Sequence, residues 1–334
     1  MLLWNRHGEK KDSVKIGPEG VNSIKFSKTK PEIFATNGKE IHHLDLRFLS
    51  ERVYIFDLNQ DEINQIDIDK KEELIVAGDD TGHVRVINIK DRKVLKTLRK
   101  HDNICSTVCF RPNQPTELIS GALDCGLIRW DFRRGKCIKE FVMNVMFKDE
   151  NEGEGVTSFI MSPPFIHTTS ITSDGDYLSC GLENGTVHVF DTSKKAVSHS
   201  KTFKGHSQGV AQVHFTSGSK TNLVSGGNDG RFILWDVTKP STNLNSIPGV
   251  DAAESACLKV VDHGEKINWL SSWQDKVDTL LLADQSNIIH SYELQLYMDT
   301  SIDRNACVHQ MQKPGHMKSG LQHLVCACMT RYNY

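Results

Sequence analysis

Hydrophobic and polar positions alternate with a period of two along most of this chain, in short runs separated by Gly, Asn and Asp. One unit reads GVAQVHFTS over residues 209–217, NLVSGG over 222–227 and RFILWDV over 231–237. Such alternation, with frequent β-branched residues and turn formers between the runs, predicts β-strands. No twelve-residue window shows a convincing helical period of 3.6 residues. The pattern therefore predicts an all-β protein.

The strand pattern recurs as an internal repeat. In each copy an apolar run ends in a large residue followed by a polar one, at Trp4–Asn5, Leu44–Asp45, Ile87–Asn88, Trp130–Asp131, Phe190–Asp191, Trp235–Asp236 and Tyr292–Glu293. Most of the spacings between these pairs fall at 40–45 residues, and the two longer ones contain polar, loop-like insertions at 148–155 and 241–255. A period in this range indicates a repeat of four-stranded units.

Two copies share four side chains at identical spacings: His101, Ser120, Asp124 and Trp130 in one, and His206, Ser225, Asp229 and Trp235 in the other. Ser, His and Asp together resemble a catalytic triad. A triad does not recur once per repeat, however, and this Ser lies inside a predicted strand rather than on an exposed turn. We interpret the four residues as structural, because a buried indole N–H and a buried imidazole need hydrogen-bond partners.

The repeat length, the Gly205–His206 pair and the closing Trp–Asp resemble the WD40-repeat family. The resemblance covers about residues 1–296 and implies a β-propeller in which Trp, Ser, His and Asp form one hydrogen-bond chain per blade. The repeat positions imply a seven-bladed plan with two defects. Trp4 falls at the end of a third strand, so the first blade is incomplete, and the N-terminal strand that closes the ring in this family is missing.

The remaining residues, 297–334, lack the repeat. We expect residues 1–296 to form the propeller and 297–334 to be a disordered or atypical tail; in the alternative, its apolar stretches 307–311 and 323–329 add the missing strands. The tail also holds cysteines and histidines, namely Cys307, His309, His316, His323, Cys326 and Cys328. These residue types suit zinc, but their spacing matches no compact structural zinc site. We expect neither a metal nor a cofactor.

Composition narrows the class of protein. The 334 residues carry a formal net charge of −2, which disfavours a dedicated nucleic-acid binder. No apolar run approaches the roughly 18–20 residues of a membrane helix. The nine cysteines show no framework spacing, and the start MLLWNRHGEK lacks a signal-peptide core, which together favour a cytoplasmic or nuclear protein with reduced thiols.

No catalytic constellation or phosphate loop stands out, so the sequence predicts a non-enzymatic protein-interaction scaffold with no small-molecule substrate. Two motifs suggest a partner: the W-D-x-R of Trp130–Arg133 and the shorter D-x-R of Asp45–Arg47. In the WD40 family such motifs mark substrate receptors that dock on the damaged-DNA-binding adaptor of cullin-4 RING ubiquitin ligases. The resemblance thus implies docking through Arg133, Asp131, Arg47 and Asp45.

Three observations keep other functions open. An Arg two positions after an Asp also occurs by chance, and the two motifs lie in the second and fourth blades of the seven-bladed plan rather than in neighbouring blades. The incomplete start could also remove elements needed for docking. The alternatives are a peptide or histone-tail reader, with its ligand across the central channel, and a generic assembly scaffold.

Overall fold

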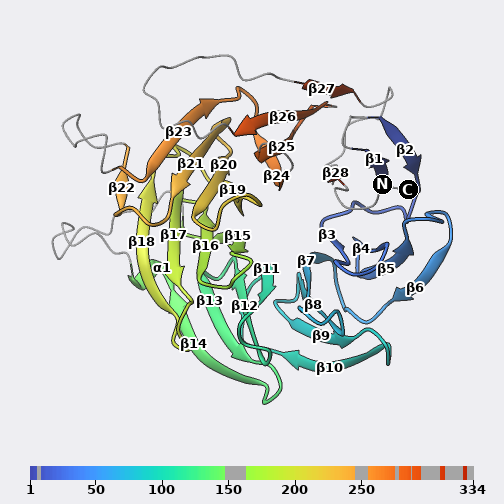
Figure 1. Ribbon diagram of the computed structural model, residues 1–334. Helices are drawn as coiled ribbons and strands as arrows, with labels where there is room; N and C mark the ends of the chain where they lie inside the picture. The colour runs from blue at the N-terminus through green and yellow to red at the C-terminus, as the bar shows by residue number, and fades with distance from the viewer. Residues whose placement is uncertain are drawn as a thin grey trace.

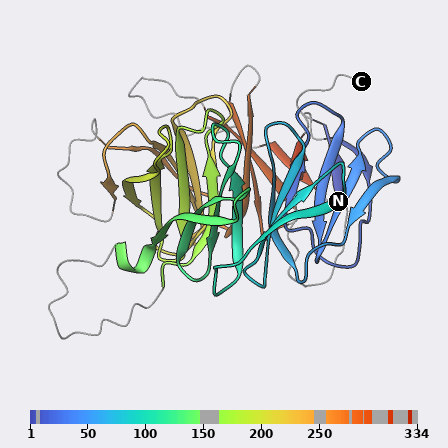
Figure 2. The ribbon, with the colours of Figure 1, turned by 90° about the horizontal axis from the view of Figure 1, so that it is seen from below.

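Seven β-sheets follow one another around a ring in this computed structural model (Figure 1). It describes residues 1–5, 9–146, 163–244, 255–274, 278–286, 288–294, 309–312 and 326–328. Seen edge-on, the strands run from one rim of the ring to the other (Figure 2). The only helix in the described residues is the short α1 (Met143–Met146), in agreement with the all-β prediction. No described helix has the length and hydropathy needed to cross a membrane.

Six of the sheets are antiparallel blades numbered here in chain order. Blade 1 has β3 (Ile24–Phe26), β4 (Glu32–Asn37), β5 (Glu40–Asp45) and β6 (Arg52–Phe56). Blade 2 has β7 (Ile63–Ile68), β8 (Leu74–Asp79), β9 (Val84–Asn88) and β10 (Lys93–Leu98). Blade 3 has β11 (Cys105–Phe110), β12 (Glu117–Ala122), β13 (Gly126–Asp131) and β14 (Lys136–Val142).

The remaining blades follow the same plan, with one extra strand. Blade 4 has β15 (Ile166–Ile171), β16 (Tyr177–Leu182), β17 (Thr186–Asp191) and β18 (Ser198–Lys204), and β22 (Thr242–Asn243) pairs parallel with β18. Blade 5 has β19 (Val210–Phe215), β20 (Asn222–Gly227), β21 (Arg231–Asp236) and β23 (Cys257–Asp262). Blade 6 has β24 (Ile267–Gln274), β25 (Asp278–Asp284), β26 (Ile288–Leu294) and β27 (His309–Gln312).

The described residues thus form six blades rather than the seven of the predicted plan. Trp4 ends β1 (Leu2–Trp4), which pairs with β2 (Lys10–Ser13) and β28 (Cys326–Cys328) in a three-stranded sheet between blades 6 and 1. The predicted number of blades was wrong, because an apolar run followed by a polar residue fits any short strand and does not mark a four-stranded blade. This sheet is anchored to blade 1, where Met1 and Val14 pack on a cluster that includes Ile24 and Ile33.

Two strands come from the region beyond residue 296. β27 pairs antiparallel with β26 and gives blade 6 its outer strand. We expected this blade to lack an outer strand, and that expectation was wrong. β28 pairs in parallel with β1. Both strands lie in the apolar stretches that the sequence offered as the alternative. The acidic insertion 148–155, most of 241–255 and the side chains of the tail's cysteines and histidines lie outside the described residues.

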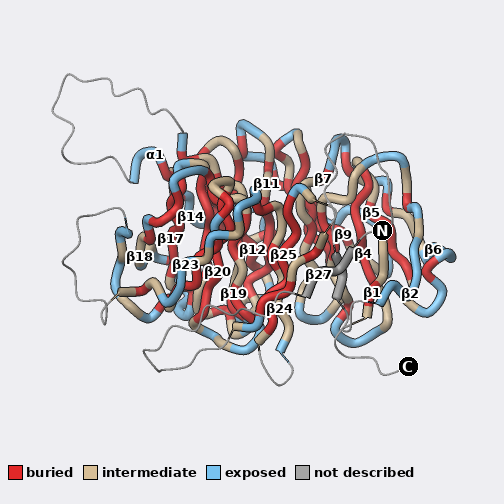
Figure 3. Tube along the Cα trace, turned by 90° about the horizontal axis from the view of Figure 1, so that it is seen from above, coloured by how far each residue is buried: buried red, intermediate tan, exposed pale blue. Residues whose placement is uncertain are grey.

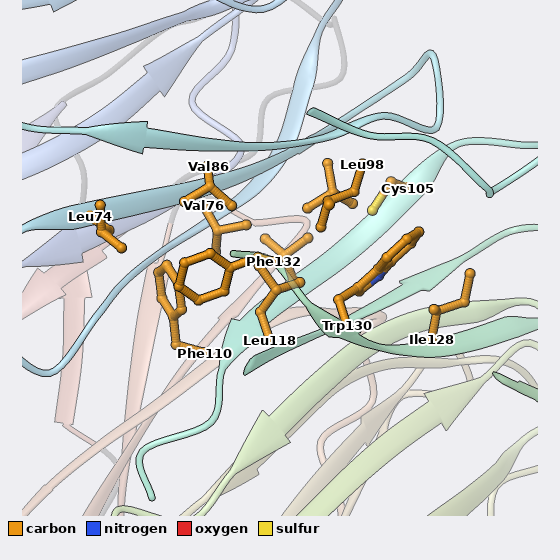
Figure 4. Packing of buried hydrophobic residues seen from close by; sticks show 12 residues of the cluster. Leu74, Val76, Val86, Leu98, Cys105, Phe110, Leu118, Ile128, Trp130 and Phe132 are labelled. Atoms are coloured by element: carbon orange, nitrogen blue, oxygen red, sulfur yellow. The ribbon is translucent and has the colours of Figure 1, made fainter. Parts of the chain in front are cut away.

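Buried residues concentrate in the middle strands, and exposed ones in the turns and outer strands (Figure 3). Every residue of β8 and of β12 is buried, because each of these strands has a neighbouring blade on both faces. The core therefore consists of apolar layers between successive blades. One layer joins blades 2 and 3 and contains Val76, Phe110 and Phe132 (Figure 4).

Successive blades are also joined by polar contacts near the start of each inner strand. The strand register shifts there in blades 2 to 6, and each shift leaves one residue at a β-bulge. The bulged Asn64 of blade 2 donates from Nδ2 to the carbonyl of Cys105 in blade 3 at 3.3 Å. Asn22 makes the matching bond to the carbonyl of Ile63 at 3.1 Å, and Ser106 bonds the carbonyl of Ile166. These three bonds fix blades 1 to 4 each against the next.

Candidate protein-interaction sites

The two predicted tetrads are assembled with nearly the same geometry. In blade 3, His101 Nε2 lies 2.7 Å from Ser120 Oγ and Nδ1 lies 2.9 Å from Asp124 Oδ2. Trp130 Nε1 donates to the same Ser120 oxygen at 2.8 Å.

In blade 5 the corresponding distances are 2.8, 3.0 and 2.8 Å for His206, Ser225, Asp229 and Trp235. Burial would raise the pKa of Asp229, but the hydrogen bonds from His206, Ser207 and Arg231 outweigh it and lower that pKa. Each Ser Oγ lies within hydrogen-bond distance of two ring nitrogens inside the fold, so the tetrads connect strands of one blade.

The docking residues implied by the sequence lie on one rim, where the third strands β5, β9, β13, β17, β21 and β26 end. We call it the third-strand rim. Arg133 is exposed there, in the turn after β13. Its Cζ lies 6.0 Å from the ring centre of Phe132, which is fully buried and packs edge-to-face on Phe110 at 5.8 Å. Figure 4 shows Phe132 inside the apolar layer between blades 2 and 3. The core therefore fixes the base of the Arg133 side chain.

The two aspartates of the motifs hold their own turns. Asp131 accepts a hydrogen bond from the backbone amide of Arg134 at 3.0 Å, and the guanidinium of Arg134 lies 3.7 Å from the same carboxylate. Arg133 forms no ion pair with any described residue. Its guanidinium is thus available to a carboxylate of another molecule.

Arg47 is held differently. Its Nε and Nη2 donate to the two carboxylate oxygens of Asp45, at 3.0 and 2.6 Å. These side-chain bonds, together with the backbone amide of Arg47, lower the pKa of Asp45 to about 2. A partner carboxylate must compete with Asp45 for Arg47, but among the described residues it meets no such competitor at Arg133.

Sequence reasoning missed a third basic residue on this rim. Lys90 is exposed in the turn after β9, two positions after Asn88, and so occupies in blade 2 the place of Arg47 in blade 1 and Arg133 in blade 3. Blades 4 and 5 have Ser193 and Thr238 there. Aligning the residues after each third strand would have found it. Arg47, Lys90 and Arg133 form what we call the basic arc, which spans three consecutive blades.

The central channel holds a second candidate site. A cavity of about 470 Å³ opens toward the opposite rim and is lined by residues of all six blades, including Glu62, Asp80 and Trp269. Another cavity, of about 330 Å³, lies toward the third-strand rim. In the 470 Å³ cavity the buried Asn228 Oδ1 has no hydrogen-bond partner among the described residues. The carboxylates of Glu62 and Asp80 outnumber the single lysine of the lining, Lys266, and together with the unused acceptor they suit a cationic, hydrogen-bond-donating ligand.

Comparison with known proteins agrees with this architecture. The model of the WD40 family (WD domain, G-beta repeat) matches residues 92–131 and 198–236, and each matched segment contains one complete tetrad. The two matched segments are WD40 repeats within a β-propeller, and these features support a WD-repeat scaffold with protein partners.

Among individual proteins, the chain is similar to the WD repeat-containing protein 53 homolog of Dictyostelium discoideum, with 28% identity over 319 residues. That match covers 88% of this chain and 85% of the relative. The E3 ubiquitin-protein ligase COP1 of Pisum sativum is 24% identical over 252 residues, which cover 70% of this chain and 32% of COP1. The nuclear distribution protein PAC1 of Komagataella phaffii is 23% identical over 261 residues, covering 73% of this chain and 51% of PAC1.

Proposed function

We propose that this propeller is a substrate receptor that docks on the damaged-DNA-binding adaptor of a cullin-4 RING ubiquitin ligase through the basic arc. The observation that carries the proposal is Arg133: an exposed guanidinium with no carboxylate partner in the described chain, on a turn anchored by a buried aromatic ring. Arg is enriched at the energetic centres of interfaces because it pairs with carboxylates in a bidentate geometry.

Two further observations support the proposal. The basic residues lie in consecutive blades, because Lys90 fills the place between Arg47 and Arg133, and one partner surface can therefore contact all three. One relative, COP1, is itself an E3 ubiquitin-protein ligase, although this chain spans only 32% of its length.

The proposal predicts a graded loss of adaptor binding. Arg133→Ala removes a guanidinium that has no ion-pair partner among the described residues, and we expect a cost of about 2 kcal/mol or more, as at interface hot spots. Arg47→Ala is expected to weaken binding less, because Asp45 already competes for that side chain. The measurement is the affinity of purified full chain for purified adaptor by surface plasmon resonance.

Ser193→Ala is the matched control, since Ser193 occupies the same place in blade 4 outside the basic arc. We expect it to bind like the wild type. Equal affinities of Arg133→Ala and the wild type would contradict docking through this arc, and absence of binding by the wild type would contradict the proposed partner.

A second candidate function is peptide binding at the opposite rim. It is favoured by the 470 Å³ cavity, whose Glu62 and Asp80 carboxylates suit a Lys or Arg side chain. Binding of basic peptides that is lost in Glu62→Gln and retained in Arg133→Ala would separate this function from adaptor docking.

A further inference from the structure

Blade 6 carries a cluster of two histidines and an aspartate that the tetrad pattern does not explain. The strand register identifies its origin. Asp284 pairs with Ile267 at the end of β25, which is the position of Gly227 opposite Val210 in blade 5. The tetrad serine is replaced by Leu282 and the turn aspartate by Ser286. The carboxylate of blade 6 therefore lies at the end of the second strand, whereas in blade 5 it lies in the turn that follows.

Blade 2 also has an aspartate at the end of its second strand, and its surroundings show which partners a buried carboxylate needs there. Asp79 pairs with Ile63 at the end of β8 and is completely buried. The guanidinium of Arg85, on the third strand, forms an ion pair with Asp79, and Asn59 Nδ2 donates to Asp79 at 3.0 Å. A buried carboxylate is costly unless it is paired with a positive charge. In blade 2 that charge is the permanent one of Arg85.

Blade 6 places imidazoles at both of these positions. His290 lies opposite Leu282 as Arg85 lies opposite Ala77, and His263 precedes its inner strand by four residues, as Asn59 does. His263 Nε2 and His290 Nε2 lie 2.9 and 3.1 Å from the same oxygen, Oδ2 of Asp284. Neither His263 nor His290 carries a permanent charge. Asp284 therefore faces two imidazole nitrogens where Asp79 faces the guanidinium of Arg85.

The three groups are positioned as metal ligands are. Their donor atoms lie within 4.8 Å of one another, and the side chains of His263, Asp284 and His290 are only 4%, 1% and 13% exposed. Zinc bonds of about 2.0–2.2 Å to nitrogen and oxygen place tetrahedral donors a little over 3 Å apart. Movements of a few tenths of an ångström would bring His263 and His290 to those separations from Asp284.

Outer contacts already orient two of the three ligands. His263 Nδ1 lies 2.8 Å from the hydroxyl of Tyr292, and the second oxygen of Asp284 accepts the backbone amide of Ser286 at 2.6 Å. Hydrogen bonds of this kind fix the tautomer and ring orientation of a ligating histidine. With Nε2 bound to a metal, His263 would keep its proton on Nδ1 and donate it to the Tyr292 oxygen.

From this geometry we infer that blade 6 binds one divalent transition-metal ion of the Zn²⁺ class through His263 Nε2, Asp284 Oδ2 and His290 Nε2. The ion supplies the positive charge that Arg85 supplies in blade 2. Two nitrogens and one carboxylate oxygen are a donor set that zinc accepts, with water in the fourth position. The enclosed position, on strands of the fold, indicates that the ion stabilises blade 6.

The test uses the full chain, freed of metal with a chelator, and titrates Zn²⁺ alone by calorimetry. We expect one tight site and a rise in melting temperature on adding Zn²⁺. The variant His290→Arg places a guanidinium within reach of Asp284, as Arg85 is of Asp79 in blade 2, and is expected to fold while binding Zn²⁺ at least tenfold more weakly. Its melting temperature should no longer respond to the ion.

The tail cysteines and histidines provide the control. A chain with Cys307, Cys326 and Cys328 all changed to Ser is expected to keep the tight site. Co²⁺ bound to the wild type should show the visible bands of a tetrahedral nitrogen and oxygen site without a thiolate charge-transfer band. A thiolate band, a His290→Arg variant that binds Zn²⁺ as tightly as the wild type, or a wild type without a tight site would each overturn the inference.

Discussion

Single side chains decide how each blade is stabilised. Blades 3 and 5 use the serine-centred tetrad, while blades 2 and 6 place a buried aspartate at the end of the second strand. In blade 6 the hydroxyl of Tyr292 contacts the histidine directly and replaces the Trp–Ser contact. The same blade backbone therefore holds two kinds of buried hydrogen-bond network. They differ at the residue opposite the start of the inner strand, which is an aspartate in blades 2 and 6 and Ala122 or Gly227 in blades 3 and 5.

One buried residue predicts a pH dependence of stability. His188 of blade 4 is almost fully buried, and burial, followed by the nearby His199 and Lys204, lowers its pKa to about 3. The unfolded chain takes up a proton near the ordinary histidine pKa of about 6.5, whereas the folded chain does not. The stabilising contribution is therefore complete above that pH and is lost as the pH falls toward 3.

We expect the free energy of unfolding to fall by about 2 kcal/mol from this group between pH 7 and pH 5, since one pKa unit corresponds to about 1.4 kcal/mol. Urea denaturation at the two pH values measures it. A His188→Gln variant should lose less stability over the same range; an equal loss would mean that other groups cause the decline.

At the scale of strands and blades, a buried charged triad joins blades 3 and 4 near the third-strand rim. Glu117 accepts hydrogen bonds from Arg129 at 2.8 and 2.7 Å and pairs with Arg111. Arg111 also donates to the carbonyls of Thr192 at 2.8 Å and Lys194 at 3.0 Å, in the turn after β17. The triad thus connects the start of β12 to a turn of the next blade.

Glu117→Ala would leave two buried guanidinium groups without their carboxylate. We expect a loss of about 3–5 kcal/mol in the free energy of unfolding, as for other broken buried ion pairs. Glu140→Ala, which removes the partially exposed pair with Lys100, is the control and should cost at most about 1 kcal/mol. Chemical denaturation compares them, and similar costs for both variants would contradict the structural role of the triad.

The strands and the tetrads could be predicted from sequence because they depend on local signals. Six of the seven repeat positions fall on third strands, from Leu44 on β5 to Tyr292 on β26. The cluster of blade 6 could not be predicted, because His290 and Asp284 meet through strand pairing and no motif spacing marks them. Lys90 was missed for another reason: Asn88 replaces the aspartate that marks the motif.

For the whole ring, closure depends on strands from the two ends of the sequence. β27 covers β26, and β28 pairs with β1, while all other blades are built from neighbouring segments. A sheet edge that loses its partner strand exposes backbone groups and promotes aggregation. Strands β27 and β28 therefore belong to the structure that closes the ring.

We expect a chain ending at residue 296 to melt at a lower temperature and to aggregate, because β26 would lose its outer neighbour β27 and expose that edge. A chain ending at residue 312 keeps β27 and loses only β28, so it should aggregate less. Thermal denaturation with light scattering measures both properties. If the two truncated chains behave alike, β27 contributes nothing to blade 6.

The pairing of β1 with β28 also affects when the protein can finish folding during synthesis. Leu2 is synthesised long before its partner Cys326, which lies more than 300 residues further along the chain. Blades 1 to 5 contain only local connections and can form while translation continues, since such contacts carry a small loop-closure cost. β1 must therefore remain unpaired on that side until β28 has been synthesised, and during this interval its exposed edge is a target for chaperones.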